Sequence, residues 1–353
     1  MKAIHSIVPP YILHRIVSNG SDEERRLAQQ TLMHVQSLMV SAQTPLPEHD
    51  ALPGGQVHRH IHDAQNQQTL PGTLVREEGQ AATGDIATDE AYEYLGATYD
   101  FFWQIFGRNS LDNAGLPLLG SVHYGQNYQN AFWNGQQMVF GDGDGKIFNR
   151  FTTAIDIIAH ELAHGVTESE ANLLYTRQSG ALNESLSDVF GAMVKQFYFK
   201  QTAQEADWIV GAGLLTEEID GKGLRSLARP GTAYDDPLLG TDPQPTHMRD
   251  YINTREDNGG VHLNSGIPSR AFYLAATDLG GYAWEKAGVI WYDVLCDKSL
   301  PQNADFTLFA QYTVNHAEQR FGMAVANTVL HAWHRVGVDT GLPNEYERTA
   351  PLD

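Results

Sequence analysis

The stretch IDIIAHELAHGVTESEA, residues 155–171, carries two histidines four residues apart, with a glutamate directly after the first. Its apolar spacing predicts a helix, and positions i and i+4 lie on one face of a helix. His160 and His164 can therefore bind one metal ion together, and Zn²⁺ suits a pair of imidazoles. Glu161 lies beside the first histidine, where it can accept the proton of a water molecule bound to that metal.

A second helical segment offers the third ligand that catalytic zinc sites use. The stretch SGALNESLSDVFGAMV, residues 179–194, carries Glu184 and Asp188 four residues apart, hence on one helix face. A buried carboxylate is unfavourable unless it is paired or binds a metal. We expect Glu184 to be the third zinc ligand and Asp188 to accept a hydrogen bond from a ligand histidine. The alternative is two ordinary helices with hydrogen-bonded core histidines and an exposed acidic face.

Composition narrows the class of protein and its partners. The chain has 353 residues, 42% of them hydrophobic, which is enough for two domains with a large core. Its formal net charge of −20 argues against nucleic acid or an anionic membrane as a partner. The single cysteine, Cys296, excludes an intramolecular disulfide. The N-terminal stretch lacks the form of a signal peptide, so we expect a protein that is cytoplasmic or exported without a standard leader.

The chain divides by composition into three parts. Residues 1–50 predict a small helical unit that ends in an exposed linker rich in Pro and Gly, at about 43–57. Strand-like stretches and one long helix follow in residues 51–170, and helices dominate residues 171–353. This order is typical of an α+β fold. A short capped unit before a protease-sensitive linker indicates a pro-segment, or else an arm that packs on the body.

Three blocks, in order along the chain, resemble those of the thermolysin family of zinc metalloproteases. They are NAFWNGQQMVFGDGDG (130–145), AHELAHGVTESEANLLYTRQSGALNESLSDVFG (159–191) and DNGGVHLNSGI (257–267). The leader, with PPYIL at residues 9–13, resembles the short pro-segments of the protealysin-like branch. The resemblance implies two catalytic domains, a β-rich N-terminal half and an α-helical C-terminal half, with the active-site cleft and the HExxH helix between them.

The resemblance also implies roles for residues around the three zinc ligands. Glu161 would be the general base that activates a zinc-bound water for attack on a peptide carbonyl. Tyr175 and His262 would stabilise the oxyanion that this attack creates. Asp257 would orient His262, and Asp188 would orient the first ligand histidine. Each of these residues, taken without the resemblance, could equally be a surface or packing residue.

Substrate binding is implied in the same way. Asn130 and the backbone of Ala131 would hold the substrate chain, and Arg225 would bind a substrate carbonyl. An apolar pocket would receive the residue after the scissile bond, and its lining would be Phe132, Phe148, Ile157, Val210, Leu214 and Leu224. Such a pocket favours cleavage on the N-terminal side of bulky hydrophobic residues, although the same residue types are also those of an ordinary core.

One departure from the family pattern concerns calcium. Relatives such as thermolysin bind a pair of calcium ions in a carboxylate cluster beside the catalytic helices. Asp156 and Asp207 remain here, but Lys195, Ala212 and Gly213 stand where acids are usual. The sequence therefore predicts that the double-calcium cluster is lost and that the Lys195 ammonium pairs with one of the two remaining aspartates.

We therefore expect a neutral zinc endopeptidase that is made as a zymogen and acts on protein or peptide substrates. Its pro-segment would lie over the cleft as an intramolecular inhibitor, with Pro9–Leu13 near the cleft, and the enzyme itself would remove it. We expect a monomer. Two alternatives remain: a zinc aminopeptidase, for which no GxMEN-type segment is present, and a non-catalytic binding protein with a structural zinc.

Overall fold

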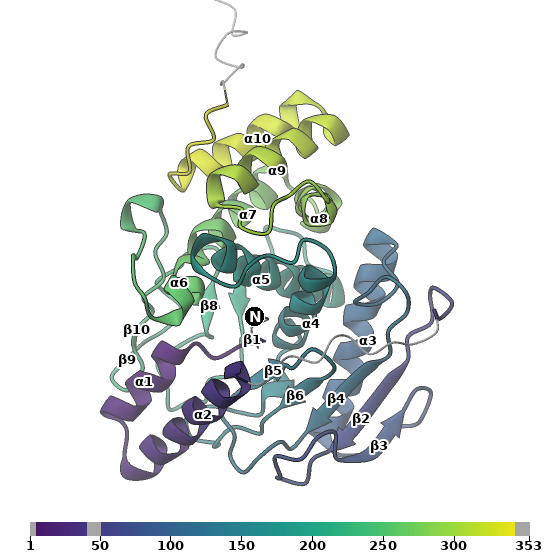
Figure 1. The fold of residues 1–353 in the computed structure, drawn as a ribbon, viewed down its shortest axis with the longest axis vertical. Helices are drawn as coiled ribbons and strands as arrows, with labels where there is room; N and C mark the ends of the chain where they lie inside the picture. The colour runs from purple at the N-terminus through teal and green to yellow at the C-terminus, as the bar shows by residue number, and fades with distance from the viewer. Residues whose placement is uncertain (1–4, 41–50, 343–353) are drawn as a thin grey trace, which may run out of the picture.

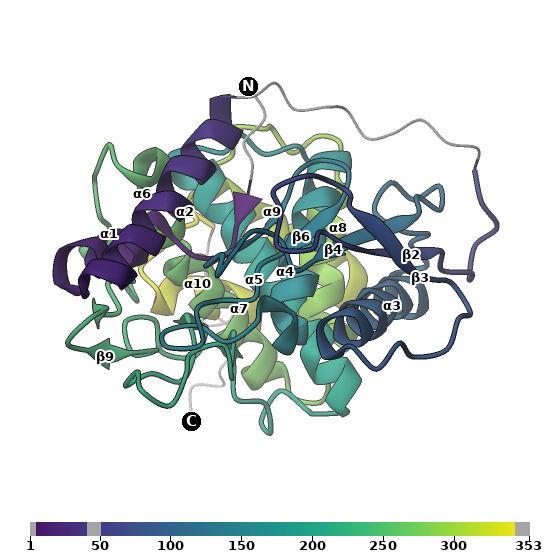
Figure 2. The same ribbon diagram turned by 90° about the horizontal axis from the view of Figure 1, so that it is seen from below.

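The computed structural model describes residues 5–40 and 51–342, and Figure 1 shows how they are arranged. A β-rich part lies at one end of the molecule and a bundle of helices at the other, with α4 (Ile155–Ser169) and α5 (Arg177–Phe199) between them. The N-terminal helices α1 (Pro10–Asn19) and α2 (Asp22–Val40) lie along one side (Figures 1 and 2). This arrangement confirms the predicted α+β architecture and the small helical pro-segment.

The β-rich part is built on a six-stranded sheet in the order β1-β5-β6-β4-β2-β3. The strands are β1 (His5–Ser6), β2 (Arg59–Asp63), β3 (Thr73–Glu77), β4 (Leu118–Val122), β5 (Ala131–Trp133) and β6 (Met138–Phe140). β6, β4 and β2 are parallel neighbours, whereas β1 with β5, β5 with β6, and β2 with β3 pair antiparallel. The outermost strand β1 belongs to the pro-segment, so the pro-segment is part of the sheet.

The helix α3 (Ile86–Phe106) packs on one face of this sheet. Asp85 caps its N-terminus by accepting a hydrogen bond from Thr88 N at 2.8 Å. Gly107, with φ 66°, ends the helix in the left-handed conformation that glycine adopts without strain. Ile61 of β2 and Leu95 of α3 are completely buried where helix and sheet meet. The helix α3 thus covers one face of the sheet, and the strands β5 and β6 of the same sheet contact α4.

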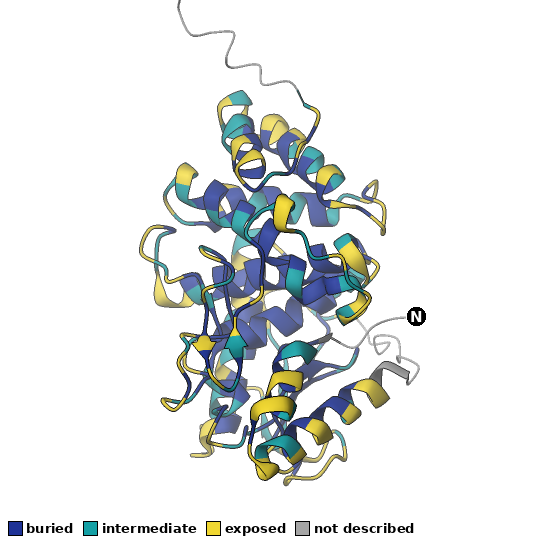
Figure 3. Ribbon diagram, turned by 90° about the vertical axis from the view of Figure 1, so that its left-hand side faces the viewer, coloured by how far each residue is buried: buried dark blue, intermediate teal, exposed yellow. Residues whose placement is uncertain are grey.

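The remaining elements form the helical part. It contains the short strands β7 (Ile209–Val210), β8 (Arg225–Ser226), β9 (Asp235–Asp236) and β10 (Gly240–Thr241), and then α6 (Asp257–Asn264), α7 (Gly266–Leu279), α8 (Val289–Cys296), α9 (Phe306–Phe321) and α10 (Met323–Arg335). The short turns η2 (Met248–Asp250) and η3 (Trp284–Gly288) complete it, whereas η1 (Phe151–Thr153) lies directly before α4. Buried residues fill the middle of the molecule, as Figure 3 shows. Within the described ranges, no helix has the length and apolarity needed to span a membrane.

The pro-segment consists of a strand and two helices. Between the helices, Ser21 N donates to Glu24 Oε2 at 2.7 Å and Glu24 N donates to Ser21 Oγ at 3.4 Å, which is a capping box. The helix α1 begins at Pro10, a position where the missing N–H of proline leaves no hydrogen bond unmade. Residues 43–50 of the predicted linker lie outside the described residues. Leu52, just after them, is anchored on the body because its N–H donates to Ala114 O at 2.9 Å.

Candidate metal centre and substrate site

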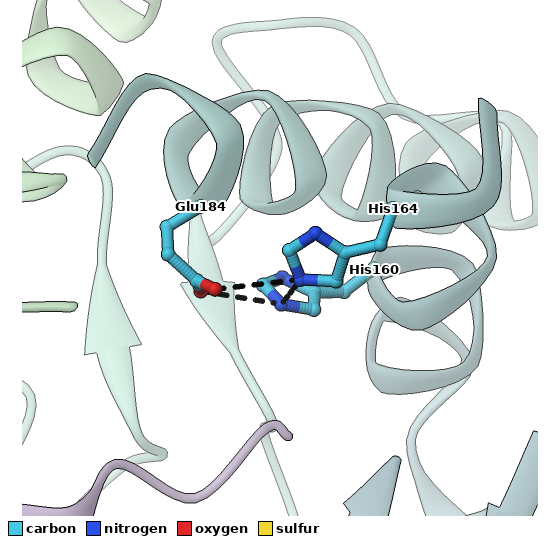
Figure 4. A group of neighbouring side chains, drawn as sticks. All are labelled: His160, His164 and Glu184. Carbon is cyan, nitrogen blue, oxygen red and sulfur yellow. Dashed lines mark hydrogen bonds and ion pairs between the residues drawn. The ribbon is translucent and has the colours of Figure 1, made fainter. Parts of the chain in front are cut away.

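Three side chains from two helices converge in the middle of the molecule, as Figure 4 shows. His160 and His164 project from α4 and Glu184 from α5. The two histidine Nε2 atoms lie 3.1 Å apart, and the Glu184 carboxylate oxygens lie 3.5 Å from His160 and 3.4 Å from His164. All three residues are at most 1% exposed. In the part of the chain that the structure describes, no other group of metal-ligating side chains is as compact.

The donor set fits a zinc ion. Asp188 Oδ1 lies 2.8 Å from His160 Nδ1, and Asn183 Oδ1 lies 2.8 Å from His164 Nδ1, so each Nε2 is left to face Glu184. Burial by itself raises the pKa of Glu184, but His262 and His164 hold it well below its usual range, so the carboxylate is ionised. Its Oε2 is buried without a hydrogen-bond partner among the described residues. Two imidazoles and one carboxylate are a typical catalytic zinc set.

Glu161 lies on α4 between the two histidines and is completely buried. Trp133 N donates to its Oε2 at 3.1 Å, while Oε1 has no hydrogen-bond partner within the described ranges. Burial raises the pKa of Glu161 to about 8, and a cation bound by the neighbouring ligands would lower it again. One carboxylate oxygen is thus anchored and the other is free to take up a proton.

Tyr175 and His262 lie on the other side of Glu184. The Tyr175 hydroxyl donates to the Glu184 carboxylate and lies 3.4 Å from His262 Nε2. Asp257 Oδ1 is 2.6 Å from His262 Nδ1, and Asp257 Oδ2 accepts from the His262 backbone N–H at 2.8 Å. The chain between them turns through three left-handed residues, 258–260, before α6 continues. This is why a stretch whose composition predicts only a turn brings His262 back toward α5.

Arg225 and Asp188 form a buried link between the metal ligands and the substrate site. Arg225 is 1% exposed and donates to Asp188 through Nε at 2.8 Å and Nη2 at 2.9 Å. Burial alone raises the pKa of Asp188, but Arg225 and His160 hold it below its usual value. The Asp188 carboxylate therefore orients His160, as predicted, and also positions the Arg225 guanidinium, which the sequence did not reveal.

The predicted substrate-binding residues hold the pro-segment in this structure. Ile7 N donates to Ala131 O at 3.1 Å, and Val8 N donates to Asn130 Oδ1 at 3.0 Å. Arg225 Nη1 donates to Ile7 O at 3.1 Å. Ile7 and Val8 are at most 1% exposed. An extended piece of the chain thus makes the contacts that were expected for a substrate.

Pro9–Leu13 was expected near the cleft, and residues 5–8, directly before that stretch, are the ones that enter it. β1 pairs antiparallel with β5, and Ser6 lies opposite Phe132. The ladder ends where it does because proline has no N–H to donate, and α1 begins directly at Pro10. The signal available in the sequence was a pair of β-branched residues in front of two prolines.

Five of the six predicted pocket residues come together. They are Phe148, Ile157, Val210, Leu214 and Leu224, each at most 1% exposed. A Cβ added at Gly211, in their midst, would lie 3.4 to 3.7 Å from side-chain atoms of three of them. Phe132 does not join this group, because side chains alternate along β5 and its ring packs instead with Tyr124 and Tyr128.

Lys195 lies between the two aspartates singled out from the sequence, Asp156 and Asp207. Its Nζ lies 2.9 and 3.0 Å from the two Asp207 oxygens and 3.3 Å from Asp156 Oδ2, and it donates to Ile209 O at 3.0 Å. Asp156 is 1% exposed. The sequence predicted a pair with one of the two aspartates, and in the structure Lys195 contacts both.

Two contacts around the zinc ligands were missed from the sequence. Asn183 and Ser187 both lie within hydrogen-bond distance of His164 Nδ1, at 2.8 and 3.0 Å. Each directly precedes one of the two acids, Glu184 and Asp188, on α5. Their own spacing of four residues was the signal in the sequence, because it places both on one face of the helix. Both ligand histidines therefore make hydrogen bonds through Nδ1 with side chains of α5, which fix the orientation of their rings.

A buried His-His-Glu centre with a free carboxylate beside it, crossed by an extended segment of the same chain, defines a zinc metallopeptidase closed by its own pro-segment. Models of known families agree with this class. Residues 48–168 match the thermolysin metallopeptidase catalytic domain, and residues 171–338 match its alpha-helical domain. Residues 5–47 match the protealysin propeptide. The chain belongs to the thermolysin family of metallopeptidases, and His160, His164 and Glu184 form its zinc site.

Individual relatives are similar over nearly the whole chain. An extracellular metalloprotease of Pectobacterium carotovorum subsp. carotovorum is 70% identical over 96% of this chain and 97% of its own. Protease PrtS of Photorhabdus sp. (strain Az29) is 52% identical over 94% of this chain and 91% of its own. The solved structure of the precursor of protealysin, a metalloproteinase from Serratia proteamaculans, is 66% identical and superposes with a TM-score of 0.89, covering 95% of this chain and 100% of that one.

These similarities decide between the alternatives that the sequence left open. The chain is a zinc metalloendopeptidase with a propeptide, and the aminopeptidase and the structural-zinc protein are set aside. They also correct the expected localisation, since the Pectobacterium relative is named extracellular and a cytoplasmic protein is no longer supported. The cytoplasmic expectation had rested on the lack of a signal-peptide form in the N-terminal stretch.

Proposed function

We propose that Glu161 is the general base of this endopeptidase and that the contacts now made by Ile7 and Val8 are those of a substrate. The observation that carries the proposal is the seating of these two residues on Asn130, Ala131 and Arg225, beside the zinc ligands. An extended chain held through its own N–H and C=O groups can be any peptide, so these contacts give affinity without sequence preference.

The chemistry divides between the metal and the side chains of this chain. Zinc, when bound by its three ligands, supplies a Lewis acid that polarises the peptide carbonyl and makes water more acidic. The free oxygen of Glu161 takes the proton from the attacking water and passes it to the departing amine. The Tyr175 hydroxyl and His262 Nε2 donate hydrogen bonds to the oxyanion on the substrate. Asp257 holds His262 in the orientation that this requires.

The apolar pocket beside Arg225 supports a preference for bulky hydrophobic residues after the scissile bond. Its five residues are completely buried and carry no polar side-chain atoms, so a charged side chain there would lose its hydration without a partner. We propose that this pocket, without Phe132, determines the specificity of the enzyme.

The pro-segment inhibits because it occupies the same contacts that a substrate needs. Ile7 and Val8 use the hydrogen-bonding groups of the site, and α1 and α2 pack on the body beside them. We propose that the enzyme removes the pro-segment itself, by cleavage in the linker at about 43–57 that was predicted from its Pro and Gly content.

Intact-mass measurements over time test this proposal. The zinc-loaded chain, its Glu161→Ala variant and an exposed control, Glu217→Ala, are each incubated with and without a zinc chelator. We expect the parent and the control to lose about 50 residues only when the chelator is absent, and Glu161→Ala to stay intact. Processing of Glu161→Ala at the parent's rate would refute both the role of Glu161 and self-removal.

The Lys195 ammonium, we propose, takes the place of a calcium ion. Its four oxygen contacts and the buried Asp156 beside it support this assignment, since a compact cation satisfies the same carboxylates. Calorimetric titration of calcium into the parent and Lys195→Glu provides the test. Tight calcium binding by the parent that the substitution leaves unchanged would contradict the assignment.

We further propose that the chain is an exported monomer whose catalytic body divides at residue 170. The name of the Pectobacterium relative supports export, and the family models that meet near this residue support domains 51–170 and 171–353, after a pro-segment 1–50. The exposed large apolar side chains of the described residues are scattered over separate elements, which favours a monomer. Activity in culture supernatant and light scattering of the purified chain test these points.

A further inference from the structure

The helix α2 is held on the body by an aromatic contact that lies apart from the metal centre. His34 Nδ1 lies 2.9 Å from the Tyr128 hydroxyl, and His34 Nε2 lies 3.0 Å from the Tyr124 hydroxyl. Its ring also packs against Tyr124, Tyr128 and Phe132, with centroid distances of 5.6, 5.3 and 5.9 Å. We call these four residues, with Val139 beneath them, the aromatic box.

The aromatic box lies directly behind the strand that blocks the substrate site. Phe132 of β5 packs on the His34 ring through its side chain, while its backbone position lies opposite Ser6 of β1. Two separate parts of the pro-segment, β1 and α2, thus contact the same body residue, Phe132: β1 through its backbone and α2 through its ring. Loss of the His34 contact would therefore loosen the pro-segment close to the place where residues 5–8 occupy the site.

We propose that His34 is a pH-sensitive latch, which holds the pro-segment on the body when its imidazole is neutral and releases it when the imidazole is protonated. This proposal rests on the function proposed above for the pro-segment. A neutral imidazole has one donor and one acceptor nitrogen, and a tyrosine hydroxyl can serve either of them. Both ring nitrogens are then satisfied between Tyr124 and Tyr128, whichever one carries the proton.

A protonated His34 would lack a counter-charge in this position. Burial raises the pKa of Tyr124 to about 12 and that of Tyr128 well above its usual value, so both hydroxyls are neutral. Glu161 acts on Tyr128 through space, but its carboxylate is directed to Trp133 N. Burial accordingly lowers the pKa of His34.

The charged groups on the side of α2 are engaged elsewhere. Glu23 pairs with Lys146 of the body at 2.9 Å, and Arg26 donates to Gln30 at 3.2 Å. Together with His34 and the loops at residues 66–68 and 125–128, they line a cavity of about 820 Å³ under α2. The cavity is open to water, so a proton can reach His34. The loop residues in its wall carry no charge, and therefore no loop carboxylate stabilises a protonated His34.

The direction of the effect follows from linkage. A histidine whose pKa is lower in the docked than in the free pro-segment favours docking fully above its free value of about 6.5. That contribution is lost as the pH falls through the free and then the docked pKa. Each unit by which docking lowers the pKa weakens docking about tenfold between neutral and acidic solution.

Hydrogen exchange of the full zinc-loaded chain in a Glu161→Ala background, which prevents processing, provides the test. Exchange is followed by mass spectrometry in peptides covering residues 22–37 and 5–8 between pH 5 and 7.5, and is corrected for the intrinsic pH dependence. We expect protection of both regions to fall in acid by about tenfold per unit of pKa lowering. His34→Gln, whose amide can also donate and accept, should remove this dependence, and the control His14→Gln, an exposed histidine on α1, should retain it.

The outcomes separate the latch from the inhibitory role of the pro-segment. Protection that does not depend on pH, or that falls equally in His34→Gln, overturns the latch while leaving the docked pro-segment in place. Peptides 5–8 that are unprotected at every pH overturn the docking itself. If His34→Gln does not fold, histidine NMR on the parent decides: His34 must titrate below the free value of about 6.5, and a pKa at or above that value refutes the latch.

Discussion

Replacing Lys195 with methionine isolates the electrostatic role of its ammonium, because methionine keeps most of the stem and removes only the charge. The variant would leave Asp156, which is 1% exposed, without its cation, and Asp156 Oδ1 already has no hydrogen-bond partner among the described residues. Removing one partner of a buried ion pair costs about 3–5 kcal/mol. Asp207 adds little, since its side chain is 50% exposed and water can replace the lost contact.

We therefore expect Lys195→Met to lower the free energy of unfolding by about 3 kcal/mol, at the low end of that range because the Lys195 side chain is itself 13% exposed. With about 2.1 cal/mol/K of unfolding entropy per residue over 353 residues, that corresponds to a fall in Tm of about 4 °C. Urea unfolding in a Glu161→Ala background, which prevents self-digestion, gives the free energy directly. Arg335→Met is the matched control, because its pair with Asp278 has both side chains more than 40% exposed and should cost less than about 1 kcal/mol.

The pH dependence gives a second signature of the same interaction. Burial raises the pKa of Asp156 even with Lys195 present, so without Lys195 it rises further. A carboxyl whose folded pKa lies above its unfolded value of about 3.9 loses stability as the pH rises through the folded value. The difference between parent and Lys195→Met should therefore grow from pH 5 to pH 8. A loss at pH 8 no larger than that of Arg335→Met would refute the reasoning.

Three further predictions follow from the site and its surroundings. Tyr175→Phe should lower kcat on a peptide substrate about 100-fold with little change in KM, because the hydroxyl acts on the oxyanion. Ile7→Ala truncates a completely buried side chain of the pro-segment and should raise hydrolysis by the unprocessed chain at least about tenfold. The hydrogen bond to Asp142 raises the pKa of His123 to about 9. The resulting contribution to the free energy of unfolding is fully present below about pH 6.5 and should be lost as the pH rises through 9. Urea unfolding of His123→Gln should show a smaller decrease in this free energy over the same pH range.

Much of the metal centre could be predicted from sequence because helical spacing fixes it locally. His160 and His164 lie on one helix, and Glu184 and Asp188 on another, so the i,i+4 rule oriented each pair without knowledge of the fold. The Lys195 pairing, by contrast, was predicted from the departure from the family pattern. The contact between α4 and α5 does not follow from spacing within either helix; Glu184 was inferred as the third ligand because a buried carboxylate needs a partner, and the family resemblance implied the same.

The parts that could not be predicted depend on contacts between distant segments. The pro-segment enters the site through Ile7 and Val8, directly before the Pro9–Leu13 stretch that was expected near the cleft. Phe132 was assigned to the wrong pocket because the side on which a residue of a short strand lies depends on the register of the whole sheet. The partners of His34 come from residues about 90 positions away, and no local pattern reveals them.

The pairing of β1 with β5 has a consequence for what the mature enzyme can cut. Once the pro-segment leaves, β5 stays paired with β6 but becomes an edge strand, and its N–H and C=O groups on the side of β1 lose their partners. The substrate then has to supply the missing strand. Segments already folded into helices or tight turns cannot do so, and a proline at the position of Ile7 has no N–H for Ala131 O. The enzyme should therefore favour locally unfolded stretches of its target proteins that lack proline at this position.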